Sequence, residues 1–247
     1  MNYSILGTAV NSTDYLAATR LIVKWAHTND SRYVCIANVH SLMEARDSQE
    51  YYRIVNSADL TAPDGMPLVW MMRLKGERGQ ARIYGPTLML HVLEAAAREN
   101  ISVGFYGSTY DVLSRLTERV HSKYPTLKVG FAYDPPFRGL SQEEDDEIIR
   151  RINASNVRIL FVGLGCPKQE RWMAAHRGTV TAVMLGVGAA FDFHAGVKSQ
   201  APIWIQQIGF EWLYRLAGEP RRLWRRYLYN NPRFIFLAVA DLLGFLR

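Results

Sequence analysis

The sequence predicts an α/β protein built on a mainly parallel, Rossmann-like sheet with helices on both faces. Near-continuous apolar runs of strand length recur along the chain, and amphipathic, helix-like segments separate them. Strands that are apolar on both faces are typical of parallel sheets covered by helices. With 247 residues, the chain is long enough for one large domain of this class or for two small ones.

The apolar runs predict six strands and the intervening segments predict helices. The strands are expected at residues 33–39, 57–62, 101–106, 127–132, 157–163 and 180–187. The helices are expected at residues 42–56, 66–74, 87–100, 110–124 and 141–153, with a further helix from Pro167. Ser141 and Glu144 have the spacing of a capping box and mark the start of one of these helices.

The last fifth of the chain has a different composition. Residues 198–247 contain eight Lys and Arg against three Asp and Glu, whereas residues 1–197 contain 21 and 20. No strand signal occurs there, and three helical pieces are expected, divided at residues 218–220 and 230–232. We predict a Rossmann-like body at 1–197 and a basic, aromatic helical appendage at 198–247. Such a segment indicates an anionic partner: a phosphate ester, an acidic lipid surface or a nucleic acid.

Cysteine usage and the N-terminus predict a cytoplasmic protein. Cys35 and Cys166 are the two cysteines, so no disulfide framework is expected and a reducing compartment is indicated. The first residues lack the basic start and long apolar run of a signal peptide. No stretch reaches the ~18–20 apolar residues of a membrane span.

The turns after the predicted strands collect residues suited to ligand binding. In open α/β sheets, ligands bind beyond the carboxyl ends of the strands. These turns contain Asn38, Pro63-Asp64-Gly65, Gly107-Ser108, residues 163–170 and residues 186–192. Glycines and free helix N-termini there could hold a diphosphate. None of the turns is a complete G-x-G-x-x-G or Walker A loop, so ordinary tight turns remain the simpler explanation from pattern alone.

Individual residues in these turns have a structural and a functional interpretation. Asp64 is either part of an ordinary Asp-Gly turn or a carboxylate able to accept a proton in the cleft. Lys168 is a cation in a first helical turn, where the helix dipole disfavours it, and this makes Lys168 and Gln169 ligand candidates. Cys166 is more simply a small residue in a tight turn than a nucleophile.

The sequence predicts neither a metal site nor a cofactor. The acidic run at 143–147 follows a capping residue, which favours a solvated helix start. The chain has no Asp-x-Asp triplet, and its histidines show no metal-ligand spacing. In the appendage, Arg222 and Arg225 share a helix face, and arginine mixed with Trp and Tyr suits bidentate phosphate binding at a membrane interface.

Taken together, these motifs resemble the WecG/TagA/CpsF glycosyltransferases, glycosyltransferase family 26. The similarity rests on P-D-G-M at 63–66, G-x-G-x-P-K-Q-E at 163–170, E-W-L-Y-R-L at 211–216 and E-P-x-R at 219–222. It extends from about Val34 to Phe234, nearly the whole chain. The combination is highly specific, although a G-x-G alone is a weak signal.

The resemblance implies an inverting, metal-independent transferase. Such an enzyme moves a sugar from a UDP-sugar to a polyprenyl-diphosphate-linked saccharide, peripherally on the inner face of a bacterial plasma membrane, in cell-surface polysaccharide synthesis. The family pattern places the catalytic base on Asp64. The substrate-binding candidates, from the turns and the family pattern together, are Asn38, Gly107, Ser108, Gly165, Lys168, Gln169, Asp192, Arg215, Arg222 and Arg225.

Two departures from the family pattern suggest a different sugar substrate. Ile36 stands where some members have a catalytic threonine, and Gln200-Ala201-Pro202 replaces a common R-A-P triplet. Two alternatives stay open from the residues alone. One is a Rossmann-type oxidoreductase, disfavoured by the missing glycine fingerprint. The other is a basic membrane- or nucleic-acid-binding module without catalysis; we expect no nucleic-acid partner, since no groove-reading motif is present. A homo-oligomer also remains open.

Overall fold

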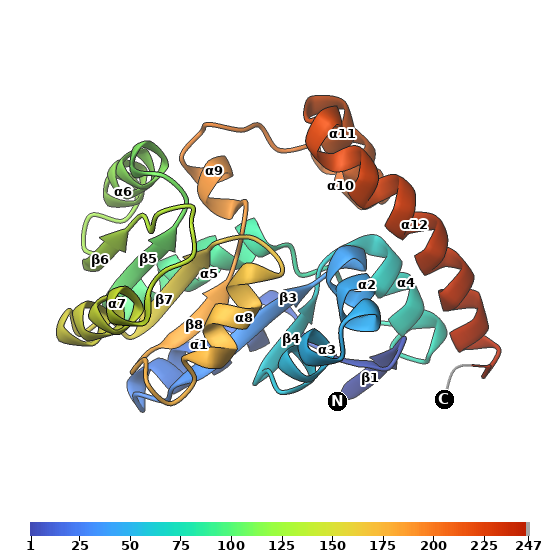
Figure 1. Ribbon diagram of the computed structural model, residues 1–247, viewed down its shortest axis with the longest axis horizontal. Coiled ribbons are helices and arrows are strands. Elements are labelled where there is room, and N and C mark those ends of the chain that lie inside the picture. The colour runs from blue at the N-terminus through green and yellow to red at the C-terminus, as the bar shows by residue number, and fades with distance from the viewer. Residues whose placement is uncertain (246–247) are drawn as a thin grey trace. The chain divides into compact units, whose positions relative to one another are not determined.

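The computed structural model describes residues 1–245 and confirms the α/β prediction (Figure 1). A six-stranded sheet has the order β4-β3-β8-β7-β5-β6, and a separate hairpin pairs β1 with β2. The strands are β1 (Asn2–Ile5), β2 (Thr8–Asn11), β3 (Arg32–Ala37), β4 (Leu60–Pro63), β5 (Val103–Gly107), β6 (Val129–Tyr133), β7 (Ile159–Gly163) and β8 (Val183–Gly186).

Twelve helices are present in the described part of the chain. They are α1 (Tyr15–His27), α2 (Val39–Asp47), α3 (Gln49–Asn56), α4 (Met66–Leu74), α5 (Gly85–Arg98), α6 (Tyr110–Lys123), α7 (Gln142–Ala154), α8 (Lys168–Ala175), α9 (Ala190–His194), α10 (Ile203–Gln207), α11 (Glu211–Gly218) and α12 (Pro220–Leu242). The capping box predicted at Ser141 is present at the start of α7.

The chain packs into two compact units, each made of discontinuous segments. Unit 1 consists of Met1–Asp14, Ile36–Tyr84 and Gln200–Arg247, and unit 2 of Tyr15–Cys35 and Gly85–Ser199. The C-terminal helices are therefore grouped with the N-terminal hairpin and with α2 to α4. The division into a body at 1–197 and an appendage at 198–247 stays a prediction.

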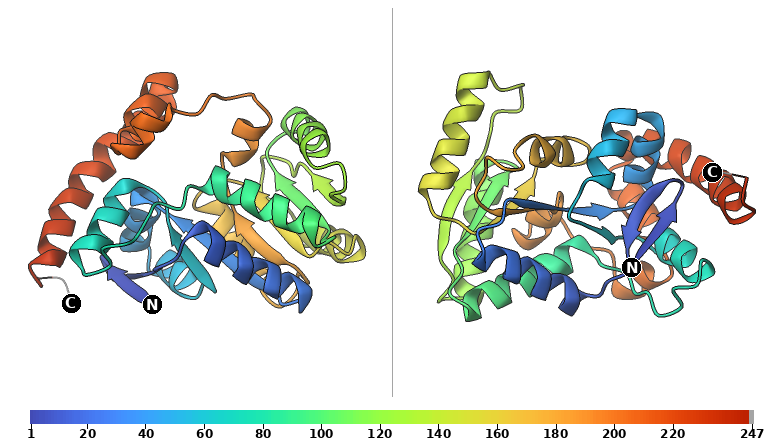
Figure 2. Two further views of the ribbon diagram at one scale, coloured as in Figure 1. Left: turned by 180° about the vertical axis from the view of Figure 1, so that it is seen from behind. Right: turned by 90° about the horizontal axis from the view of Figure 1, so that it is seen from below.

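Unit 2 contains most of the parallel sheet. β5 pairs in parallel with β7 from Val103↔Ile159 to Gly107↔Gly163, and β7 pairs with β8. Helices α1 and α5 cover one face (Figure 2, left) and α7 and α8 cover the other. The core is aromatic at its centre, where Phe105 stacks on Phe161 and meets the edge of Phe191. This arrangement brings the ends of β5 and β7, at Gly107 and Gly163, side by side.

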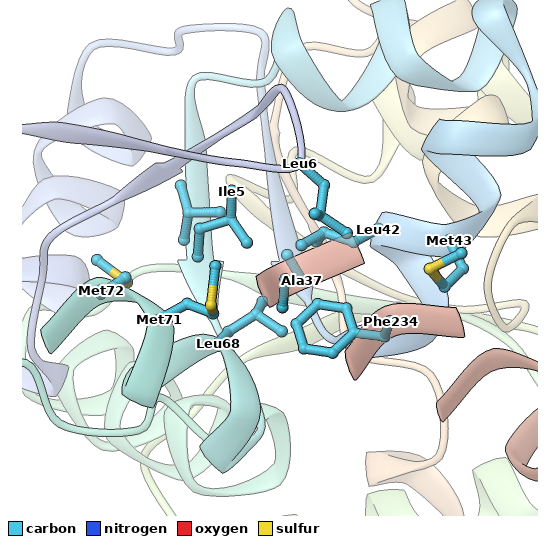
Figure 3. Close-up of a cluster of buried hydrophobic side chains, with 11 residues drawn as sticks. Ile5, Leu6, Ala37, Leu42, Met43, Leu68, Met71, Met72 and Phe234 are labelled. Atoms are coloured by element: carbon cyan, nitrogen blue, oxygen red, sulfur yellow. The ribbon is translucent and has the colours of Figure 1, made fainter. Parts of the chain in front are cut away.

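Unit 1 has its own apolar core, to which the C-terminal helix contributes. Ile5 from the hairpin, Leu42 from α2 and Leu68 from α4 are completely or almost completely buried and meet Phe234 from α12 (Figure 3). Since Phe234 is only 4% exposed, α12 is part of this core and not merely attached to it.

Two predicted helix boundaries were wrong. The helix expected at 42–56 is two helices, because Ser48 adopts an extended conformation and its hydroxyl accepts a hydrogen bond from the N–H of Tyr51, which starts α3. The break expected at 230–232 is absent, and α12 continues through Pro232. Proline removes one helical hydrogen bond, but contacts on both sides hold the helix: Asn230 with His40, Arg233 with Asp47, and Phe234 in the core.

Candidate active site

A pocket of about 440 Å³ lies in unit 1, at the end of β4. Helices α4, α11 and α12 supply most of its lining, which is largely apolar. Several polar and charged side chains interrupt this lining, among them Asn38, His40, Asp64, Arg82, Glu211, Arg215 and Arg226. An apolar cavity with a few convergent polar groups is the usual form of a ligand-binding site.

Asp64 is placed in this pocket by the turn that ends β4. Its backbone N–H donates to the carbonyl oxygen of Ala37, 2.7 Å away, which fixes the turn against the end of β3. The next residue, Gly65, has a φ of +100° and begins α4, a conformation that favours glycine. The Asp64 carboxylate Oδ1 accepts a hydrogen bond from Arg82 Nε at 2.7 Å. The predicted base is therefore an anchored carboxylate in the pocket.

Arg82 joins Asp64 to a second carboxylate that the sequence analysis did not single out. Its Nη2 donates to Glu211 Oε2 at 2.5 Å, and its guanidinium lies 4.3 Å from the centre of the Tyr84 ring. The side chains of Arg82, Asp64 and Glu211 are only 14%, 15% and 11% exposed. A buried network of this kind is weakly screened by solvent, so it holds its members in fixed positions.

Burial and charge shift the pKa values of this network. Burial opposes the charge on Arg82, but the carboxylates of Asp64 and Glu211 outweigh it, so the pKa of Arg82 is raised. Burial raises the pKa of Glu211, and the nearby Asp64 adds to the effect while Arg82 opposes it. Burial also raises the pKa of the Tyr84 phenol, helped by the two carboxylates. The guanidinium thus stays charged between the two carboxylates.

Asn38 and Ile36 lie on the segment leading into α2. Asn38 is the N-cap of α2, and its Oδ1 accepts hydrogen bonds from the N–H groups of His40 and Ser41. The capping role explains an asparagine here without a ligand, although the residue also lines the pocket. Ile36 is buried in β3.

The three predicted phosphate-binding arginines do not share one environment. Arg215 lines the pocket, 3.9 Å from Glu211. Arg222 and Arg225 are exposed, the first paired with Glu219 and the second over the Trp224 ring. Arg226 lines the pocket instead. The sequence patterns did not mark Arg82, Glu211 or Arg226 as site residues, although Glu211 begins the E-W-L-Y-R-L stretch and Arg226 belongs to the basic appendage.

Unit 2 has a separate pocket of about 390 Å³ at the carboxyl ends of β5, β6 and β7. Ser108, Lys168 and Trp172 line it, together with residues 135–138. Beside it, Gly107 has a φ of +119°, and a Cβ there would lie 2.6 Å from the backbone carbon of Gly163. Glycine is therefore required where these two turns pass each other.

The remaining predicted residues of unit 2 are placed around this edge of the sheet. Lys168 is exposed at the first turn of α8. Gln169 is buried; its Oε1 accepts from the N–H of Gly165 and its Nε2 donates to Glu170 Oε1, so its amide supports the loop. Asp192, in α9, forms an ion pair with Lys198 at 3.0 Å. Gln169 therefore has a structural role, because its amide bonds to both Gly165 and Glu170.

The described residues contain neither a cluster of metal ligands nor a membrane-spanning helix. Within residues 1–245, no group of three or more His, Cys, Asp or Glu side chains is arranged to hold a metal ion. No helix over the same residues combines the length and apolarity needed to cross a bilayer.

Comparison with known proteins identifies the family. The profile of the glycosyl transferase WecG/TagA/CpsF family matches residues 3–247. An N-acetylglucosaminyldiphosphoundecaprenol N-acetyl-beta-D-mannosaminyltransferase of Bacillus spizizenii is 31% identical over 84% of this chain and 78% of its own. The Staphylococcus aureus (strain MW2) protein of the same name is 28% identical over 94% of this chain and 90% of its own. The chain belongs to the WecG/TagA/CpsF family of glycosyltransferases.

Proposed function

We propose that this glycosyltransferase moves a sugar from a UDP-sugar to a saccharide carried on a polyprenyl diphosphate, in the synthesis of a bacterial cell-surface polymer. The observation that carries the proposal is the Asp64 carboxylate, lining an apolar pocket and anchored by Arg82. The names of the relatives, which specify an N-acetylglucosaminyldiphosphoundecaprenol acceptor, support the same acceptor class for this chain.

In the proposed reaction, Asp64 is the general base. It accepts the proton of an acceptor-sugar hydroxyl while that oxygen forms a bond to the anomeric carbon of the donor. The bond from this carbon to the UDP oxygen breaks on the opposite face, so the configuration inverts. UDP leaves with the bonding electron pair. Arg82 keeps the Asp64 carboxylate in place through the 2.7 Å hydrogen bond. It forms no covalent bond in the reaction.

The leaving diphosphate is stabilised by protein groups rather than by a divalent ion in this proposal. The candidates are the backbone N–H groups at Gly107-Ser108 and the side chain of Arg215, with Arg222 and Arg225 as the further predicted contributors. Lys168 lines the unit 2 pocket, where it would meet donor phosphates. Gly165, Gln169 and Asp192 are proposed to shape the same donor site, and Asn38 the acceptor site.

We further propose that the enzyme works peripherally at the inner face of the plasma membrane. Apolar side chains of the C-terminal helices are exposed, including Trp204 at 63%, Trp224 at 48% and Phe236 at 76%. Exposed arginines flank Trp224 in the sequence at 221, 222 and 225, and Arg225 lies over the Trp224 ring. Aromatic and basic side chains together favour the surface of an acidic bilayer. This placement brings the protein to a lipid-linked acceptor.

The proposal is tested by incubating the protein with a panel of UDP-sugars and one short-chain, diphosphate-linked acceptor. We expect one donor to give a product whose new linkage has the inverted anomeric configuration. The rate should be the same in EDTA, because Arg and backbone N–H groups are proposed to carry the charge on UDP. Retention of configuration, or a loss of rate in EDTA that Mg²⁺ or Mn²⁺ restores, would overturn the corresponding part of the mechanism.

A further inference from the structure

Two helices, α4 and α12, supply rows of residues that line the unit 1 pocket. On α4 the lining residues include Met66, Trp70 and Leu74, which recur every four positions and share one helix face. On α12 they include Ile235 and Val239, again four positions apart. At about 1.5 Å per residue, the α4 face from Met66 to Leu74 extends for about 12 Å, and the α12 face, which continues to Leu242, for about 10 Å. The lining therefore extends along both helices, and we call this part of the pocket the trough.

The two helices run side by side in the same direction. Phe234 of α12 packs in one cluster with Leu68 of α4. Seven residues further along each helix, the Asp241 carboxylate accepts a hydrogen bond from Lys75 Nζ at 2.9 Å, immediately after α4 ends. This pairing fixes the direction of the trough: it starts at the Asp64 end of α4 and continues towards Leu74 and Leu242.

The chemical character of the trough changes along this direction. Asp64, Arg82, Glu211, Arg215 and Arg226 line the end at the start of α4. Beyond it the named walls are apolar, and their side chains are unusually exposed for their size: Leu74 at 69%, Ile235 at 64% and Val239 at 52%. Lys75 and Asp241, which lie at the far end, are paired with each other. A ligand that fits has an anionic end and a long hydrocarbon end.

We propose that the trough binds the first isoprene units of the acceptor's polyprenyl chain, with the diphosphate of the lipid towards Arg226. This assignment rests on the proposed function and deepens it, because it gives the hydrocarbon part of the acceptor a protein-binding site of its own. The chain is then recognised by the α4 and α12 walls and not only by the bilayer. Apolar burial along the trough provides the affinity, and the charged end sets the direction in which the lipid binds.

Two adjacent residues of α12 provide a matched test. Ile235 lines the trough, whereas Phe236 is more exposed, at 76%, and is absent from the lining. The test compares Ile235→Asn, combined with Val239→Asn, against Phe236→Asn. All three side chains are exposed, so neither variant should disturb the core, and thermal unfolding checks this.

Calorimetry measures the affinity of the protein for farnesyl diphosphate and for inorganic diphosphate, without membrane or detergent. Wild-type protein should bind farnesyl diphosphate roughly 10- to 100-fold more tightly than inorganic diphosphate, because the chain buries apolar surface. The ratio should fall towards one in the Ile235/Val239 variant and stay at the wild-type value in Phe236→Asn. Phe236→Asn should instead weaken binding to vesicles of acidic lipid.

Three outcomes would overturn the proposal: no preference for farnesyl diphosphate in the wild type, an unchanged ratio in the Ile235/Val239 variant, or an equal loss in Phe236→Asn. The last outcome would indicate general adsorption of the lipid to the apolar surface of α12. Because the assay measures binding, it does not depend on sugar transfer. If the protein shows the expected ratio of affinities but transfers no sugar, the proposed function is wrong and the assignment of the trough still holds.

Discussion

The pocket of unit 1 and the pocket of unit 2 are built from different parts of the fold. Helix faces of α4, α11 and α12 form most of the first, which is apolar with a buried charge network at one end. Turns after β5, β6 and β7, with the start of α8, form the second, which is richer in polar groups. The difference shows that one chain can build an apolar pocket from helix faces and a more polar pocket from strand-end turns. In the proposed function, the first would hold the lipid-linked acceptor and the second the polar donor.

The first way to test this comparison is to remove a side chain that holds α12 in unit 1. Phe234→Ala should lower the free energy of unfolding by about 3–5 kcal/mol, because Phe234 is buried among Ile5, Leu42 and Leu68. Phe236→Ala, two residues away on the exposed side, should change it by less than about 0.5 kcal/mol. Urea denaturation measures both. Equal effects would mean that α12 is not part of the unit 1 core.

The second test removes a charge from the buried network. Glu211→Gln should lower turnover by roughly 10- to 100-fold, because Arg82 loses the second carboxylate that positions it on Asp64. Binding of UDP, whose phosphates we propose to contact Lys168 in the unit 2 pocket, should not change. Glu147→Gln, which affects an exposed pair with Arg150 in unit 2, is the control and should keep the wild-type rate. A Glu211→Gln variant with wild-type turnover would remove Glu211 from the positioning network.

The same variant has a pH signature with a defined sign. Burial raises the pKa of Glu211 in the folded protein above its unfolded value of about 4.3, so the folded state binds the proton more tightly. The wild type should therefore lose stability relative to Glu211→Gln as the pH rises from about 4.3 through the folded pKa. Chemical denaturation at several pH values measures this. An opposite slope would contradict a raised pKa for Glu211.

The smallest expected effect concerns the surface pair that joins α12 to α2. Hydrogen bonds from Arg233 lower the pKa of Asp47, so the pair stabilises the fold above the unfolded pKa of about 3.9 and loses this contribution as the pH falls. Asp47 is 50% exposed, so Asp47→Asn should cost less than about 1 kcal/mol at neutral pH, measured by thermal unfolding. A larger cost would mean that this pair, and not the core around Phe234, holds α12.

The two pockets also differ in how far the sequence predicted them. Apolar runs identified all six strands of the main sheet, and the turns after them led to Asp64, Ser108 and Lys168, since strand ends can be recognised locally. The unit 1 walls could not be recognised in this way. Pairing of α4 with α12, and of Arg82 with Glu211 across 129 positions, depends on tertiary packing that has no local signal. Pro232 even predicted a break where packing maintains a helix.

The most direct test of the central claim, that the anchored carboxylate of unit 1 is the general base of sugar transfer, is the single-turnover rate of Asp64→Asn. The substitution keeps the size of the side chain and an oxygen that can accept the bond from Arg82 Nε. We expect a rate roughly 10²- to 10⁴-fold below that of the wild type, with UDP affinity and melting temperature unchanged. A folded Asp64→Asn protein that binds UDP and transfers sugar at close to the wild-type rate would contradict this claim.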